Sequence, residues 1–168
     1  MKKLDSANWL RRLEIFLASG VLAVSLIGAG ETRASSANRA IAQTIETLQK
    51  SDQRWIQINL ANQRLIAWEG GKQVYAIVIS TGKKSTPTRT GTFKIQSKYK
   101  STRMRGRDYD VPNVPYAMFY QGNYGIHGAY WHRKFGTPVS HGCINLAPNH
   151  AKWLFNWAAL GTPVVISK

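Results

Sequence analysis

The chain has 168 residues and carries 23 Lys and Arg against eight Asp and Glu, which gives a net charge of +15 at pH 7. This length suits one folded domain with a short targeting segment and argues against a two-domain enzyme. Apolar residues make up 43% of the chain, which is enough for a packed core and argues against a disordered tail protein.

Residues 1–34 have the order of charged and apolar residues that is typical of a secretory signal. Four basic residues among the first twelve precede an apolar run over residues 15–30, and small residues follow around Ala34. The run holds 16 residues, fewer than the roughly 20 that span a bilayer. We therefore predict export to the periplasm or cell wall with a cleaved signal peptide, or alternatively an uncleaved signal anchor. In the second case only this segment is expected to contact a membrane.

The charge of the remaining chain indicates an anionic partner. From Ser35 onward, 18 Lys and Arg stand against five Asp and Glu, a net charge of +13. Nucleic acid, anionic lipid and cell-wall polymers all fit such a charge, which also aids solubility. Because an exported protein meets cell-wall polymers and anionic lipid first, we expect no nucleic acid as the partner, and the charge alone does not choose between the other two.

The chain from residue 35 to residue 80 passes from a helical to a β-like pattern. Residues 35–52 favour a linker or a short helix, since Ile41, Ile45 and Leu48 recur at roughly helical spacing. The catalytic domain is expected over residues 53–168 and begins with short β-like runs separated by turns. The predicted strands of this β-meander are Trp55 to Leu60, Arg64 to Glu69 and Val74 to Ser80.

A polar loop over residues 81–91 follows, whose Gly and Pro residues exclude regular structure before a strand at residues 92–97. The next segment, Lys98 to Asp110, is strongly basic and has arginines at positions 103, 105 and 107. We interpret this basic segment as a surface loop, which either borders a binding site or is simply solvated.

The last third of the chain predicts two more strands, a long loop, a helix and a closing strand. The strands are residues 114–120 and 124–127, and a Gly-rich aromatic loop continues to Ser140. Pro148 opens the helix, Gly161 lies just past its end, and residues 164–167 close the domain. The predicted fold class is therefore mainly β, with one definite helix beyond the N-terminal segment.

The reactive residues are concentrated in one stretch. Cys143 is the only cysteine, so no internal disulfide forms, and a lone thiol in an oxidising compartment needs a reason to be kept. Three of the four histidines lie with it inside residues 127–143. A thiolate is the nucleophilic form of cysteine, and a nearby imidazole both removes the proton and stabilises the charge, which suits acyl transfer. A buried, inert thiol is the alternative.

The glycine before the cysteine fits the same chemistry. Gly142 lets the backbone approach a substrate closely, and the amides of Gly142 and Cys143 are candidates for an oxyanion hole. A zinc site built from His127, His132, His141 and Cys143 is the chemical competitor. Their spacing fits no standard zinc finger, and a bound metal would make the thiol unavailable as a nucleophile, so we expect no metal here.

The motif His127-Gly128, followed by Ser140-His141-Gly142-Cys143-Ile144-Asn145, resembles the signature of L,D-transpeptidases of the YkuD-like kind. Upstream segments resemble the strand and loop that precede the cleft in that family, and the likeness extends from about Trp55 to Lys168. These segments are Ser80-Thr81-Gly82, Thr86-Pro87-Thr88 and Thr90-Gly91-Thr92-Phe93-Lys94-Ile95.

The resemblance implies a β-sandwich or barrel-like catalytic domain with a helix after the cysteine loop. It also implies a reaction on peptidoglycan stem tetrapeptides, in which the cysteine attacks the bond between diaminopimelate and D-Ala and releases D-Ala. The acyl group then passes to another stem peptide, which links two third-position residues directly. Water as acceptor would make a carboxypeptidase, and a lipoprotein is a further possible acceptor. Acylation by carbapenems is implied as well, and neither a metal nor an organic cofactor is needed.

The resemblance also assigns roles to individual residues. Cys143 becomes the nucleophile and His127 the general base, its ring held by the carbonyl of Gly128, with His141 as an accessory residue. Gly142 and Cys143 supply the oxyanion amides. Ser140 shapes the turn, and Asn145 supports the substrate or the loop. Many relatives have Arg at the Asn145 position, so the resemblance by itself assigns no carboxylate-binding role to Asn145.

Other aromatic and histidine residues are given structural roles. His132 is expected to be solvated or stacked, and His150 to have no part in the chemistry. Trp153 and Trp157 are expected to pack the helix rather than stack on a sugar. Tyr120 and Tyr130 are candidates for the lining of the cleft.

Two other classes of protein compete with this interpretation. A non-catalytic basic protein that binds the wall or nucleic acid would need only the charge. A papain-like or NlpC-like hydrolase would place the cysteine before the histidine, whereas here His127 precedes Cys143.

Overall fold

The computed structural model describes residues 25–168, with side chains from residue 34 onward. The predicted signal segment, residues 1–34, therefore lies for the most part outside the described residues. Within the described part, no helix combines the length and the apolarity that crossing a membrane requires. The chain divides into two units, residues 1–36 and 37–168.

Helix α1, Ser25–Gln49, occupies most of the segment that was predicted to be a linker or a short helix. Its residues 37–49 belong to the second unit. There Ile41 and Leu48 are buried against Trp55 and Val165 of the sheet. This packing explains the helical spacing of the apolar residues, because it buries one helix face on the domain.

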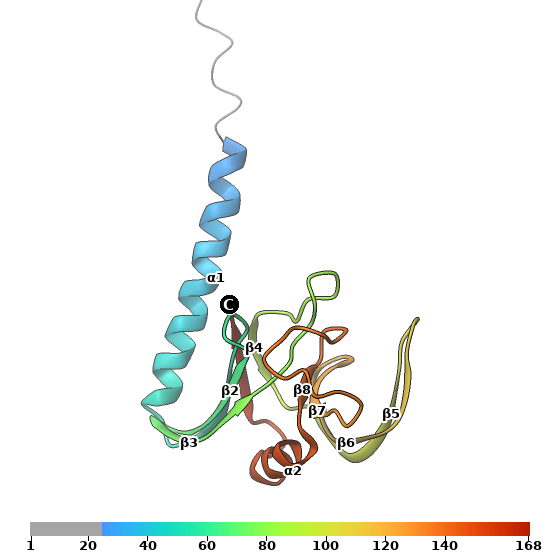
Figure 1. Cartoon of the computed structure of the whole chain (residues 1–168). Helices are drawn as coiled ribbons and strands as arrows, with labels where there is room; N and C mark the ends of the chain where they lie inside the picture. Colours follow the sequence, from blue (N-terminus) through green and yellow to red (C-terminus); the bar gives the residue numbers. More distant parts are fainter. Residues whose placement is uncertain (1–24) are drawn as a thin grey trace, which may run out of the picture. The chain divides into compact units, whose positions relative to one another are not determined.

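The second unit contains two β-sheets (Figure 1). The five-stranded sheet has the order β3-β2-β1-β9-β4, and the four-stranded sheet has the order β5-β6-β7-β8. The strands are β1 Arg54–Asn59, β2 Arg64–Glu69, β3 Lys72–Val78, β4 Gly91–Lys94, β5 Ser97–Arg105, β6 Asp110–Gln121, β7 Tyr124–Gly128, β8 Ile144–Leu146 and β9 Pro163–Ser167. The mainly β fold class is confirmed, with neighbouring strands antiparallel except for the pairs β1–β9 and β7–β8.

The two sheets share one apolar core. Ile56, Ile58 and Ile77 of the first sheet and Met118 and Ile126 of the second are each at most 2% exposed. Helix α2, Pro148–Trp157, adds Ala151 and Leu154 to this core. In Figure 1 it lies at the lower edge of the sheets. The core thus holds the end of β7 and the start of β8 in a fixed place.

The prediction of a surface loop over Lys98 to Asp110 is wrong. Residues 97–105 form β5, which pairs with β6 from Ser97↔Phe119 to Arg105↔Asp110 and leaves only a short turn at the hairpin tip. The arginines recur every second residue because successive side chains of a strand point to opposite faces. Charged residues are tolerated there because β5 is an edge strand with exposed side chains.

The helix predicted to follow the cysteine loop begins at Pro148 as expected, but a strand that was not predicted lies between the two. This strand is β8. β8 is parallel to β7, and its register places His127 opposite Asn145. Paired residues of neighbouring strands share a face of the sheet, so this register brings the two motif segments together.

Candidate active site

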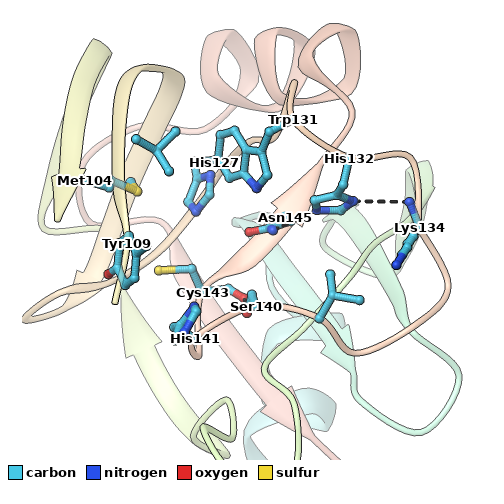
Figure 2. A pocket seen from close by; sticks show the side chains of 12 residues that line it. Met104, Tyr109, His127, Trp131, His132, Lys134, Ser140, His141, Cys143 and Asn145 are labelled. Carbon is cyan, nitrogen blue, oxygen red and sulfur yellow. Dashed lines mark hydrogen bonds between the residues drawn. The ribbon is translucent and has the colours of Figure 1, made fainter. Parts of the chain in front are cut away.

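A pocket of about 470 Å³ brings together the ends of β7 and β8, the loop before Cys143 and the tip of the β5–β6 hairpin (Figure 2). Both Cys143 and His127 line it, although they are separated by 15 residues in the chain. The lining residues are Met104, Tyr109, Val111, His127, Trp131, His132, Lys134, Val139, Ser140, His141, Cys143 and Asn145.

His127 is a buried, neutral imidazole. It is 2% exposed, its Nδ1 lies 3.0 Å from the carbonyl oxygen of Gly128, and its ring stacks on Trp131 at 5.8 Å. A carbonyl only accepts, so Nδ1 carries the proton and Nε2 keeps its lone pair. Burial lowers the pKa of His127 to about 4. Figure 2 shows its ring above the Cys143 thiol.

Cys143 is partly buried, and its Sγ lies 3.5 Å from the backbone oxygen of Asn123. Burial raises the pKa of the thiol above its ordinary value. The resting cysteine is therefore protonated at neutral pH, and its activation depends on a base in the same pocket.

Ser140 ties the turn before the cysteine together. Its hydroxyl donates to the Cys143 carbonyl at 2.5 Å and accepts from the Gly142 N–H at 3.1 Å. One of the two amides predicted for an oxyanion hole is thus already bound, whereas the Cys143 N–H has no acceptor among the described residues. Gly142 has φ +112°, and an added Cβ would lie 2.7 Å from the ring of Tyr124, so this position requires glycine.

The polar loop at residues 81–91 braces the cysteine turn from outside the pocket. Thr86 Oγ1 donates to the Ser140 carbonyl, and Thr88 Oγ1 donates to the Gly142 carbonyl, both at 2.9 Å. This is the loop whose Thr-Pro-Thr sequence was noted as resembling the family. Its two hydroxyls satisfy backbone carbonyls that the irregular turn leaves unpaired.

His141 points to a partner that the sequence analysis missed. Its Nε2 lies 2.9 Å from Asp108 Oδ2, and the ring of Tyr109 packs on it at 4.8 Å. The hydrogen bond from His141 lowers the pKa of Asp108. Both partners belong to the tip of the β5–β6 hairpin, which the sequence analysis interpreted as a loop. The alternating arginines before this tip were the only indication in the sequence of a strand that leads to the pocket.

Asn145 and His132 form a second polar pair in the pocket. Asn145 is 3% exposed, and its Nδ2 lies 3.0 Å from His132 Nε2. The backbone N–H of Lys134 donates to His132 Nδ1 at 3.2 Å. His132 is thus partly buried and hydrogen-bonded, besides its ring contact with Phe135 at 5.1 Å. Burial, assisted by the charge of Lys134, lowers the pKa of His132.

The two tyrosines proposed for the cleft do not line this pocket. Tyr120 is 1% exposed and packs on Phe93 at 5.2 Å, because the alternation of β6 directs it into the core. Tyr130 is exposed, and its hydroxyl donates to the Pro112 carbonyl at 2.6 Å.

The remaining aromatic predictions concern α2. Trp153 and Trp157 stack on each other at 5.8 Å, and Tyr75 stacks on Trp153 at 4.0 Å, so both tryptophans pack the helix as expected. His150 lies 3.0 Å from the Tyr75 hydroxyl, outside the pocket.

Among residues 34–168, no three His, Cys, Asp or Glu side chains are grouped as a metal site. The histidines nearest the thiol are instead bound to protein partners, His127 to Gly128 and His141 to Asp108.

The fold and the pocket define a class of protein: a two-sheet β domain in which a cysteine and a neutral histidine share one cleft. Comparison with known proteins agrees with this class. The family model described as the YkuD L,D-transpeptidase catalytic domain matches residues 53–166. The chain therefore belongs to the L,D-transpeptidase catalytic domain family.

Individual relatives support the same assignment. L,D-transpeptidase 1 of Mycobacterium tuberculosis is 32% identical over 109 residues, which cover 57% of this chain and 43% of the relative. The catalytic domain of the Enterococcus faecium L,D-transpeptidase is 31% identical, with a TM-score of 0.63 and coverage of 70% and 98% of the two chains. A structure of an L,D-transpeptidase in complex with imipenem, LdtMt1, is 27% identical, with a TM-score of 0.65 and coverage of 70% and 60%. The chain spans 26% to 43% of the length of the first curated relatives it matches.

Proposed function

We propose that this protein is an exported L,D-transpeptidase that acts on peptidoglycan stem tetrapeptides through a thioester on Cys143. The observation that carries the proposal is that the thiol shares its pocket with His127, a buried imidazole whose Nδ1 is occupied by the Gly128 carbonyl. The free Nε2 is then the base that the protonated thiol needs. The net charge of +13 from Ser35 onward suits an anionic wall polymer.

The first half of the proposed reaction forms the acyl-enzyme. His127 Nε2 takes the thiol proton as Sγ attacks the carbonyl between diaminopimelate and D-Ala. The N–H of Cys143 donates to the resulting oxyanion, and the Gly142 N–H joins it if Ser140 releases that amide. The intermediate collapses as His127 returns the proton to the departing amine, so that D-Ala leaves and a thioester remains.

The second half transfers the acyl group. The side-chain amine of another stem's diaminopimelate attacks the thioester carbon and loses a proton to His127. The C–S bond then breaks, and the proton returns to Cys143. The product is a direct cross-link between two third-position residues. Water or a lipoprotein amine in place of the stem amine gives the alternative products, and the thioester itself would be the same.

The roles of the surrounding residues follow from their contacts. Ser140 holds the turn that presents Cys143 by bonding both its carbonyl and the Gly142 amide. His141 is accessory, since its Nε2 is engaged by Asp108 rather than by the thiol. Asn145 faces the pocket opposite His127 and supports the bound substrate.

The test is incubation of the protein with purified disaccharide tetrapeptide, followed by mass spectrometry. Cross-linked dimers with loss of one D-Ala indicate transfer, and tripeptides alone indicate the hydrolytic alternative. Cys143→Ala should abolish both products while leaving the pocket and wall binding intact. If Cys143→Ala still forms cross-linked product, the thioester mechanism is wrong. If neither the wild type nor Cys143→Ala yields product, a non-catalytic binding function is favoured.

A further inference from the structure

One permanently charged side chain, that of Lys134, lines the active-site pocket. No carboxylate is among the lining residues, and none of the ion pairs within the described residues involves Lys134. Its ammonium group therefore brings a positive charge to the pocket without an internal counter-ion. An anionic group of a bound molecule would meet no competing protein carboxylate there.

The backbone of Lys134 is fixed although its side chain is exposed. Its carbonyl accepts from Ser80 Oγ at 2.7 Å, and its N–H donates to His132 Nδ1 at 3.2 Å. Figure 2 shows this second bond, with Asn145 on the other side of the His132 ring. The side chain thus projects from an anchored point at the rim, and a ligand need order only the flexible stem.

The hydrogen bonds of His132 determine which end of the Asn145 amide faces the pocket. A neutral imidazole that accepts at Nδ1 carries its proton on Nε2, so Nε2 donates to the amide end 3.0 Å away. Nδ2 occupies that contact in the structure, but the oxygen and nitrogen ends of an amide have the same shape. The surrounding hydrogen bonds therefore decide which end faces His132. The oxygen therefore faces His132, and the N–H₂ takes the buried position that has no partner within the described residues.

The pocket consequently offers two donors that have no protein partner within the described residues. One is the exposed ammonium of Lys134, and the other is the amide N–H₂ of Asn145, a side chain that is 3% exposed. A buried donor without a partner costs free energy that a ligand acceptor would recover. A cation and an amide donor that line one pocket suit a carboxylate.

We propose that Lys134 is a specificity-determining residue that binds a carboxylate of the donor peptide, with the Asn145 amide as the second donor and His132 as the positioning residue for that amide. This inference rests on the proposed function, whose tetrapeptide donor carries one carboxylate on the side chain of its third residue and another at its C-terminus. The C-terminal carboxylate lies next to the peptide bond that Cys143 breaks, and the other lies at the far end of the third side chain.

The test compares three synthetic donors: one with both carboxylates free, one amidated at the third side chain, and one amidated at the C-terminus. Release of the fourth residue is measured for the wild type and for Lys134→Gln, Lys134→Arg and Arg133→Gln. In the wild type, amidation of the recognised carboxylate should raise KM about three- to tenfold with little change in kcat. The donor that shows this rise identifies which carboxylate is bound.

The variants separate recognition from net charge. Lys134→Gln should raise KM for the free donor by a similar factor and should no longer respond to amidation. Lys134→Arg should keep the discrimination. Arg133→Gln removes the same charge from the neighbouring exposed residue, which does not line the pocket, and should behave like the wild type. Equal discrimination by Lys134→Gln and the wild type overturns the proposal.

The role of His132 has its own readout. His132→Gln replaces the imidazole by an amide, which does not fix the direction of the Asn145 amide, and it should raise KM for the free donor without affecting turnover of bound substrate. If no donor is turned over, the proposed function fails separately. The affinity of the same three peptides can then be measured by NMR titration for Cys143→Ala and for the double variant Cys143→Ala with Lys134→Gln. The comparison still decides whether Lys134 recognises a carboxylate.

Discussion

At the scale of single residues, the site depends on how burial acts on two titratable groups. Burial lowers the pKa of His127 to about 4 and raises the pKa of Cys143. Both shifts favour the neutral forms, so the resting pair is a thiol and an imidazole rather than an ion pair. A neutral thiol is less prone to oxidation than a thiolate, so this arrangement limits unproductive oxidation of Cys143.

The shift of His127 predicts a dependence of stability on pH. The ordinary pKa near 6.5 applies to the unfolded chain, so between pH 6.5 and 4 the unfolded state binds more protons than the folded state. The free energy of unfolding should therefore fall as the pH drops through this window, by about 2–3 kcal/mol from this group. Urea unfolding at pH 7.5 and 4.5 measures it.

Two variants isolate the contribution of His127 in that experiment. His127→Gln should lose most of the difference between the two pH values, whereas His150→Gln, which lies outside the pocket, should retain it. An unchanged pH dependence in His127→Gln would show that the buried imidazole is not the group responsible.

At the scale of elements, the β5–β6 hairpin and α2 are joined by a lysine on the edge strand. Lys98 Nζ donates to the Phe155 carbonyl at 2.6 Å and to the Ala158 carbonyl, and it lies 4.4 Å from the Phe155 ring centre. These carbonyls belong to the last turn of α2, where no intrahelical donor remains. The same helix packs on β6 and β7, which carry the hairpin and His127.

Replacement of Lys98 by Met should therefore destabilise the domain. The change keeps the apolar stem but leaves two carbonyls without this donor, which is expected to lower the free energy of unfolding by about 1–3 kcal/mol. Urea denaturation measures the loss. Lys100→Met, an exposed residue two positions along the same strand, is the matched control and should change stability by less than about 0.5 kcal/mol. Equal effects of the two changes would contradict the assigned cap.

At the scale of the whole molecule, the excess of positive charge is distributed widely. The exposed ion pairs within the described residues use few of the cations, and those of Arg103 and Arg105 share the single carboxylate of Asp110. Exposed pairs of this kind contribute little to stability. The excess charge would attract the proposed anionic wall polymer over a long range.

Binding of the protein to insoluble peptidoglycan should therefore weaken with salt. Between ~0.05 and ~0.5 M NaCl the screening length falls severalfold, so co-sedimentation should decline steadily over this range. Cys143→Ala should follow the same curve because the charge is unchanged. Binding that stays constant with salt would instead indicate recognition through uncharged contacts.

The strands and α2 were largely predictable because their signals are local. Alternation of apolar residues in β1 and β2, and Pro148 at the start of α2, depend only on neighbours in the chain. β5 was missed because its polar side chains conceal a strand that is defined by pairing with β6. β8 was missed because three residues gain strand character only beside β7.

The sequence alone determined the family and predicted the reactive pair, since His127, Gly128 and the segment around Cys143 form a motif with a specific order and spacing. Tertiary structure alone decided the surroundings of that pair. Asp108 reaches His141 across 33 positions, Asn145 reaches His132 across 13, and Lys98 reaches α2 across 57. Such contacts depend on strand register and side-chain direction, which no local pattern encodes, so they became visible only in the folded domain.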